Sequence, residues 1–522
     1  MARAASLTRP DSDWSAALLL TAGLTLARVV ALFRTPLQLY PDEAQYWLWS
    51  RALDFGYYSK PPMIAWAIWA TTALGGDAEA WVRLAAPLFQ AGATLAVFAL
   101  GRRLYGGAAG FAAAGLYALM PAVQISSAVM ATDAPLLFFL GLTLVAYAEL
   151  QSAEGGGRLA WAAGVGAALG LGFLSKYAAV YAVIGIVLHL IVSREARRAW
   201  TPGAALIAIA VFALVLAPNL AWNAAHGFAT FHHTAANAAW GQGGVNPAGP
   251  LAFLASQFAV FGPIPFGALI AGLGLAVRRR ALAKPDLLLL CFTLPPVLIV
   301  AGQAFLSRAN ANWSGASYLP GAVLVAAWLV RWRARRWLAA AVATQAALAA
   351  FVLLALAQPR IADALGASNS LKRVRGWSET TRLVIDRAQA VQANGGLSAV
   401  AVNDRFLFYT LAYYGRGYFG RPGAPPLVYW LLTASPQNQA EMSAPLTLAL
   451  GARVLGVIYE GFHHREMLAD FAAVPWREID HIGLDRKHQR RIDLFIGEGY
   501  RPQPRDPVTG LPKPSSSRPT PP

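Results

Sequence analysis

The sequence has few charged residues and almost no cysteine. Only 13% of its 522 residues are Asp, Glu, Lys or Arg, whereas a soluble protein of this length would carry roughly 25%. The single cysteine, Cys291, lies inside an apolar run, so no disulfide can form within the chain and no cysteine-based metal site is supported. The chain also lacks a Walker A sequence, a glycine-rich dinucleotide fingerprint after a strand, and an HExxH motif. Nucleotide hydrolysis and haem or flavin chemistry therefore have no support.

The chain is rich in long apolar runs. The chain is 57% hydrophobic, with a mean hydropathy of +0.44. Apolar runs of about 18 or more residues, enough to cross a hydrocarbon core of about 30 Å, recur over the first 357 positions. We expect an all-α polytopic membrane protein, because helices satisfy every backbone polar group within a bilayer. The run 14–33 is too long for a signal-peptide core and lacks a small-residue cleavage site, so we expect it to be the first span.

We expect about eleven transmembrane helices from these runs. Their approximate limits are 14–33, 83–101, 108–121, 134–150, 159–175, 177–193, 203–219, 252–277, 286–306, 315–330 and 337–357. Each even-numbered loop carries arginine: Arg102-Arg103, Arg158, Arg194 with Arg197-Arg198, Arg278-Arg279-Arg280 with Lys284, and Arg331 to Arg336. Because arginine-rich loops stay on the cytoplasmic side, the odd-numbered loops should face outward. This sorting explains the net charge of +17 without nucleic-acid binding.

The composition changes after Ala357. Residues 358–500 are more polar and contain short β-like runs at 397–402, 454–458 and 492–496. We expect a membrane domain over 1–357 and a small C-terminal α/β domain over 358–500, outside the membrane on the periplasmic side. Residues 501–522 are rich in proline and serine, and we expect them to be disordered.

The first outward loop, 34–82, is the most informative. Its tryptophans and tyrosines suit helices lying in the membrane interface, and we expect one to start at Pro41 and a second, amphipathic helix to run from 62 to 74. Asp42 and Glu43 open the first of these helices. They can complement the helix dipole, or one can act as a general base at the membrane surface.

Asp133 stands at the outer start of the fourth span, where it can serve as an N-cap or share a membrane level with Asp42. Three cations face the same side, namely Lys60, Lys176 and Arg308. Outer lysines often extend to lipid headgroups. The alternative role is to bind a lipid-linked phosphate, where one contact at about 4 Å and an effective dielectric near 20 is worth about 4 kcal/mol before desolvation.

The outward loop 220–251 contains His226, His232 and His233. A metal site is one interpretation, but the loop has no acidic residue and the spacing fits no standard zinc pattern. Binding of a sugar or phosphate and an ordinary capped loop remain open. We add Tyr57, Tyr58 and Asn312 to the candidate substrate-binding residues. We predict no metal site in the protein, although the sequence leaves open whether the reaction needs a divalent cation.

These motifs together resemble a known family. They are the Asp-Glu of the long first outer loop, Tyr57-Tyr58-Ser59-Lys60-Pro61-Pro62, Asp133-Ala134-Pro135, Ser175-Lys176-Tyr177 and Ala311-Asn312-Trp313. Over residues 14–330 their order and common side resemble the GT-C membrane glycosyltransferases. Within that group they are most similar to the branch of bacterial relatives of the protein O-mannosyltransferases and the lipid A aminoarabinose transferase, the ArnT-like branch.

The resemblance implies transfer of a hexose or pentose from a polyprenyl-phosphate carrier, usually with inversion. It implies that Asp42 is the catalytic carboxylate, that Glu43 is its neighbour in the motif and that Asp133 is a second acidic position. Lys60, Lys176 and Arg308 would surround the carrier phosphate. One departure is Ser59, since the aminoarabinose branch has an acidic residue before Lys-Pro-Pro. The sugar therefore stays open, as does the choice of lipid A, another glycan or a protein as acceptor.

Two other classes of protein compete with a glycosyltransferase. A transporter or polyprenyl-lipid flippase tends to place ionisable groups near the bilayer midplane, whereas the spans of this chain are nearly free of charge. A non-catalytic scaffold would not need aspartate, lysine and histidine on one side. We therefore expect an enzyme of the inner membrane that binds a polyprenyl-phosphate-sugar donor, an envelope acceptor and membrane lipids, and no nucleic acid.

Overall fold

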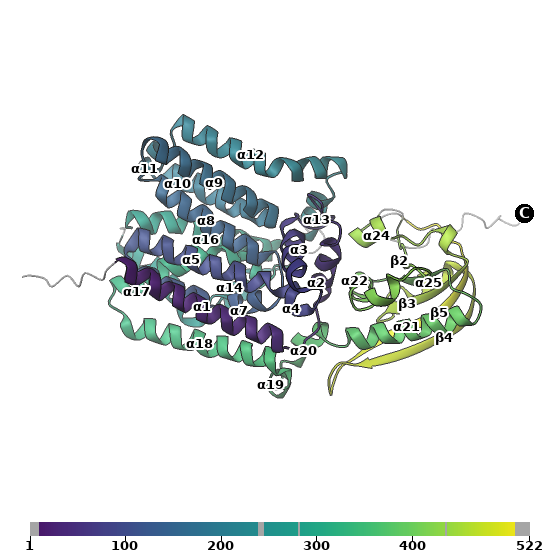
Figure 1. Ribbon diagram of the computed structural model, residues 1–522. Helices are drawn as coiled ribbons and strands as arrows, with labels where there is room; N and C mark the ends of the chain where they lie inside the picture. Colours follow the sequence, from purple (N-terminus) through teal and green to yellow (C-terminus); the bar gives the residue numbers. More distant parts are fainter. Residues whose placement is uncertain (1–9, 239–244, 280–281, 434–435, 507–522) are drawn as a thin grey trace, which may run out of the picture. The chain divides into compact units, whose positions relative to one another are not determined.

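The computed structural model describes residues 10–238, 245–279, 282–433 and 436–506 (Figure 1). The chain forms two compact units. One, the membrane unit, contains the residues up to Pro36 and Leu53–Gln358. The other, the α/β unit, contains Leu37–Ala52 and the chain from Pro359 onward. The second unit thus joins part of the first predicted outer loop to the C-terminal part of the chain. Residues 507–522, most of the tail predicted to be disordered, lie outside the described residues.

The named elements in the described part of the membrane unit are all helices. Its helices in the first half are α1 (Pro10–Arg34), α3 (Met63–Gly75), α4 (Glu79–Arg83), α5 (Ala85–Tyr105), α6 (Gly107–Ala118), α7 (Pro121–Ala128), α8 (Asp133–Leu150) and α9 (Gly155–Ser175). They are followed by η1 (Tyr177–Ala179), α10 (Val180–Val192), α11 (Arg194–Ala199), α12 (Pro202–Ala225), α13 (Ala229–Ala238), α14 (Gly249–Val260), α15 (Pro263–Arg279), α16 (Lys284–Leu306), η2 (Ala311–Ser317), α17 (Tyr318–Arg331) and α18 (Arg335–Ala357). Neighbours pack side by side, with α9 between α8 and α12 (Figure 1).

Each predicted span is helical, but the expected count of eleven is not confirmed. Among the described residues, eight helices are long and apolar enough to cross a membrane, or nine if the bent pair α6 and α7 forms one span. The predicted span 252–277 is divided into α14 and α15. The break falls at Gly262, whose φ of +104° suits a residue without a Cβ, and Pro263 follows it. The predicted span 177–193 is a 3₁₀ turn followed by the 13-residue α10.

The arginine-bearing helix ends of the membrane unit contact one another. Arg103 at the end of α5 forms an ion pair with Glu149 at the end of α8, at 3.0 Å. Arg331 at the end of α17 binds Asp286 at the start of α16, which also accepts a hydrogen bond from Tyr105. Helices α8, α9, α12 and α16 each have their other end in or beside one of the predicted outer loops. The sorting of arginine and candidate site residues to opposite helix ends is therefore present in the fold.

The α/β unit contains a five-stranded mixed sheet. Its helices are α2 (Pro41–Trp49), α19 (Pro359–Ala364), α20 (Ser368–Leu371), η3 (Lys372–Val374), α21 (Trp377–Ala393), α22 (Arg405–Tyr414), α23 (Arg416–Phe419), α24 (Gln439–Ser443), η4 (Leu448–Leu450) and α25 (His464–Ala469). Its strands are β1 (Ala399–Val402), β2 (Leu427–Tyr429), β3 (Arg453–Tyr459), β4 (Phe471–Gly483) and β5 (Gln489–Tyr500), in the order β2-β1-β3-β5-β4. Strand β1 runs parallel to β2 and β3, and β5 is antiparallel to β3 and β4. The three predicted strands are β1, β3 and β5.

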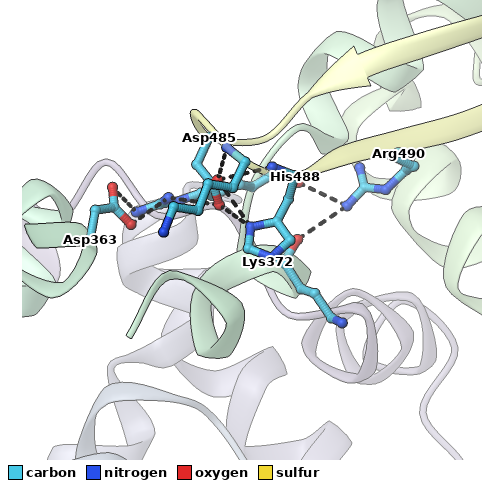
Figure 2. A network of polar contacts seen from close by, with 7 residues as sticks. Asp363, Lys372, Asp485, His488 and Arg490 are labelled. Atoms are coloured by element: carbon cyan, nitrogen blue, oxygen red, sulfur yellow. Dashed lines mark hydrogen bonds and ion pairs between the residues drawn. The ribbon is translucent and has the colours of Figure 1, made fainter. Parts of the chain in front are cut away.

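A polar network fixes the turn between β4 and β5 (Figure 2). Arg375 pairs with Asp363 at 3.0 Å and lies 3.8 Å from Asp485, whose carboxylate also binds the His488 ring. Arg490 donates to the backbone carbonyl of Arg375 at 2.9 Å. Burial would raise the pKa of Asp485, but hydrogen bonds from the following backbone and from His488 outweigh it and lower that pKa. The network thus ties the connection before α21 to the sheet.

Candidate active site

The two acidic residues at the start of α2 have different partners. Glu43 is fully buried, and its Oε2 accepts a hydrogen bond from the backbone N–H of Tyr40 at 2.8 Å. This contact closes the helix start, as a capping glutamate does. Asp42 has no part in that contact, and its side chain is 34% exposed. The capping interpretation therefore fits Glu43, and Asp42 remains available for chemistry.

Asp42 is held by an arginine that the sequence analysis did not identify. Arg405 Nη1 donates to Asp42 Oδ1 at 2.8 Å and to Gln45 Oε1 at 3.0 Å. Burial would lower the pKa of Arg405, but the charge and hydrogen bond of Asp42 outweigh it and raise that pKa. Because Arg405 is 363 residues away from Asp42 and stands in no recognisable motif, only the fold could reveal the pair.

Helix α2 and the two residues Gln38 and Leu39 before it contact the rest of the α/β unit through more than this ion pair. Leu39 N–H donates to the hydroxyl of Tyr414 at 2.7 Å, and Gln38 N–H donates to the backbone carbonyl of Val374 at 2.9 Å. The rings of Trp47 and Tyr413 meet edge to face at 4.9 Å. These contacts fix α2 within the α/β unit.

In the membrane unit, Asp133 and Lys176 meet as a pair. Lys176 Nζ lies 2.9 Å from Asp133 Oδ1, and the two side chains are 24% and 23% exposed. Asp133 is the first residue of α8, where a carboxylate complements the helix dipole. Lys176 follows the end of α9 in extended backbone, with φ −163° and ψ 135°. The structure thus brings together two residues that the sequence analysis placed on the same side.

The outer loop 53–62 is hydrogen-bonded to α12. Asn219 Nδ2 donates to the backbone carbonyl of Phe55 at 2.6 Å, and Trp222 Nε1 donates to Asp54 Oδ2 at 2.7 Å. Asn219 also accepts from the hydroxyl of Tyr177, the neighbour of Lys176, at 2.9 Å. The loop, the turn at Lys176 and the end of α12 therefore form one network. Asp54 and Asn219 were not among the predicted site residues.

Tyr57, Tyr58 and Lys60 lie in this anchored loop. Tyr57 is buried, its backbone carbonyl accepts from Thr230 Oγ1 at 2.8 Å, and its N–H donates to the Lys60 carbonyl at 3.1 Å. Burial raises the pKa of the Tyr57 hydroxyl to about 12. The ring of Tyr58 lies 5.7 Å from that of His233. The loop thus places Tyr58 beside one of the three predicted histidines.

Of the other predicted residues, only His226 joins these contacts within the described residues. His226 stacks on Trp222 at 4.1 Å, and His232 is exposed. Arg308 and Asn312 are exposed around the start of η2, and neither side chain has a hydrogen bond or ion pair within the described residues. The described part of the chain contains no group of three or more His, Cys, Asp or Glu residues that could hold a metal ion.

The close approach of Gly56 to Trp222 gives a testable prediction. A Cβ added at Gly56 would lie 2.4 Å from Trp222 Cε3, so Gly56→Ala must push the indole away and break its hydrogen bond to Asp54. We expect the activity of the protein to fall by about 10-fold or more, because small misplacements of positioning groups are costly in rate. Gly302→Ala is the matched control, since nothing lies within 4 Å of its added Cβ. Equal activity of the two variants would contradict a role for this loop.

The candidate site residues thus include two carboxylates that each pair with one basic residue. Asp42 pairs with Arg405, and Asp133 pairs with Lys176. In both, one oxygen accepts the charge-assisted hydrogen bond. The second oxygen of Asp42 has no hydrogen bond within the part of the chain that the structure describes. A carboxylate oxygen left in this way can accept a proton from a hydroxyl.

Known proteins are similar to this chain in sequence, and others are similar to it in fold. Residues 59–222 match the family described as dolichyl-phosphate-mannose-protein mannosyltransferase. The chain is 36% identical over 399 residues to the lipid A galacturonosyltransferase RgtD of Rhizobium johnstonii, and the alignment covers 76% of this chain and 82% of RgtD. The chain belongs to the family of GT-C membrane glycosyltransferases that includes RgtD.

Solved structures of ArnT have a fold similar to that of this GT-C glycosyltransferase. ArnT from Cupriavidus metallidurans in the apo state matches with a TM-score of 0.63 at 16% identity, covering 93% of this chain and 98% of ArnT. The same protein bound to undecaprenyl phosphate matches with a TM-score of 0.62, also at 16% identity, covering 95% and 99%. The GT-C glycosyltransferase is thus an enzyme and a multi-pass protein of the inner membrane, and a flippase or a scaffold is not favoured.

Proposed function

We propose that this glycosyltransferase moves a sugar from a polyprenyl-phosphate carrier to lipid A at the periplasmic face of the inner membrane. The observation that carries the proposal is the 36% identity to RgtD, which is named as a lipid A galacturonosyltransferase. The fold shared with an ArnT that binds undecaprenyl phosphate supports a lipid-linked donor. The arginine groups at the opposite helix ends support the orientation, because they mark the cytoplasmic side.

The donor sugar in this proposal is galacturonic acid. Its support is the name of the relative together with Ser59, which stands before Lys60-Pro61-Pro62 where the aminoarabinose branch has an acidic residue. An acidic side chain suits a cationic amino sugar, whereas it would repel the carboxylate of a uronic acid. A neutral serine at this position is compatible with an anionic sugar.

The proposed reaction is a single displacement. A lipid A oxygen attacks the anomeric carbon and forms the new C–O bond, while Asp42 accepts the proton of the attacking hydroxyl. The C–O bond to the carrier breaks, and the polyprenyl phosphate leaves as a monoester, which inverts the anomeric centre. Lys60, Lys176 and Arg308 are assigned to the carrier phosphate, where they would stabilise the negative charge that develops on it. Asp133 would hold Lys176 in place through the 2.9 Å contact.

Mass analysis of lipid A from cells with and without the protein tests this function. We expect lipid A from cells that contain the protein to carry one additional hexuronic acid, which is lost when the protein is absent. Asp386→Asn, a change in an exposed residue of α21, should leave the modification in place. Lipid A of identical mass in both strains would reject the acceptor, and an added pentose or neutral hexose would reject the sugar.

A further inference from the structure

We propose that Arg405 is a positioning residue for Asp42, so that the C-terminal part of the chain completes the catalytic site. The inference rests on the proposed role of Asp42 as general base. Arg405 Nη1 binds Asp42 Oδ1 at 2.8 Å and Gln45 Oε1 at 3.0 Å, which uses both hydrogens of that nitrogen. The carboxylate is thereby fixed through one oxygen, and the other stays open to a hydroxyl proton.

The fold holds Arg405 as well as Asp42. Arg405 is the first residue of α22, whose start is capped by Asp404: its Oδ1 accepts from the backbone N–H of Phe406 at 2.7 Å and of Leu407 at 3.3 Å. The Arg405 guanidinium lies 4.5 Å from the centre of the Phe406 ring, in a cation–π contact. Its backbone is therefore set by the cap and its head group by the ring. A planar guanidinium whose backbone and head group are both held fixes the direction of the Asp42 carboxylate better than a flexible ammonium would.

The position of Arg405 is not explained by a need to hold the unit together. Half-exposed ion pairs contribute little to stability, and this one joins side chains that are 41% and 34% exposed. Packing of Trp47 on Tyr413 and the backbone contacts of Gln38 and Leu39 already attach α2. Loss of the guanidinium should therefore leave the protein folded and act on the reaction. A positioning role also gives the C-terminal part of the chain a part in catalysis, beside the Asp42 of α2.

The test compares full-length Arg405→Gln and Arg405→Lys with wild type in reconstituted membranes, using a polyprenyl-phosphate-sugar donor and lipid A. Arg387→Gln is the matched control, because Arg387 pairs with Glu478 in the same unit with side chains 38% and 31% exposed. We expect Arg405→Gln to lower kcat by about 10- to 100-fold while KM for the donor changes by less than about twofold and the thermal midpoint stays near that of Arg387→Gln. Arg405→Lys should recover part of the loss.

Chemical rescue separates positioning from a structural role. Adding guanidinium to Arg405→Ala should restore part of kcat, whereas urea, which is planar but uncharged, should not. The inference is wrong if Arg405→Gln turns over like Arg387→Gln, or if guanidinium and urea act alike on Arg405→Ala. It is also wrong if kcat falls only together with the amount of folded protein. A wild-type protein that transfers no sugar would instead reject the proposed function, so the two failures can be told apart.

Discussion

Asp42→Asn should fold and insert normally but transfer sugar at least about 100-fold more slowly, because a general base contributes about 10²- to 10⁴-fold to such a reaction. The amide oxygen can still accept the hydrogen bond that Arg405 Nη1 now makes to Oδ1. What the amide cannot do is take up the proton of the attacking hydroxyl. The expected loss therefore lies in kcat, with donor and acceptor KM little changed.

The measurement is turnover in reconstituted membranes, with thermal unfolding of the same samples as the check on folding. Asp386→Asn makes the same chemical change at an exposed position of α21 and should behave like wild type. Near-normal turnover by Asp42→Asn would remove Asp42 from the role of base. If Asp386→Asn lost as much turnover as Asp42→Asn, the cause would be a general effect of removing a negative charge from the α/β unit.

Lys176→Ala should weaken the use of the lipid donor by about 10- to 100-fold, since a hydrogen bond to a charged group is worth about 1.5–3 kcal/mol. Lys176 lies beside the loop that carries Lys60, and Asp133 holds its ammonium at 2.9 Å, close to the outer end of α8 and α9. A phosphate could share this ammonium, which has three hydrogens to donate. The measurement is KM for the donor and for lipid A in the same preparation.

A double variant distinguishes phosphate binding from simple pairing. If Lys176 serves only to neutralise Asp133, then Asp133→Asn combined with Lys176→Met should restore activity, because neither charge is then left without its partner. If Lys176 binds the carrier phosphate, the double variant should remain as weak toward the donor as Lys176→Ala. Equal changes in KM for donor and acceptor would argue against phosphate binding.

The membrane part of the fold could be predicted because its signals are local. Apolar runs of sufficient length form helices wherever water is excluded, and arginine loops report the side of the membrane. The helices, their order and the opposite ends for arginine and site residues follow from these rules. Breaks within a span are harder to predict, because a glycine such as Gly262 is common in membrane helices and only its φ of +104° shows the break.

The partners of the site residues could be predicted only in part. Asp133 and Lys176 stand at neighbouring helix ends, so their common side could be inferred from topology alone. Asp42 and Arg405 are brought together by packing of α2 on α22, which no sequence pattern records. The capping role of Glu43 was visible as a pattern, but the sequence could not say which of two adjacent acids would fill it. Strand β2 was missed because it is three residues long, and β4 because the apolar residues of its second half do not recur at every second position.

Transfer of the sugar to lipid A can be measured by counting the products that the purified protein forms in vesicles containing lipid A and a polyprenyl-phosphate-linked hexuronic acid. We expect free polyprenyl phosphate to appear in a one-to-one ratio with glycosylated lipid A, and neither product to form when one substrate is left out. Movement of the intact lipid-linked sugar between leaflets without release of polyprenyl phosphate would contradict it.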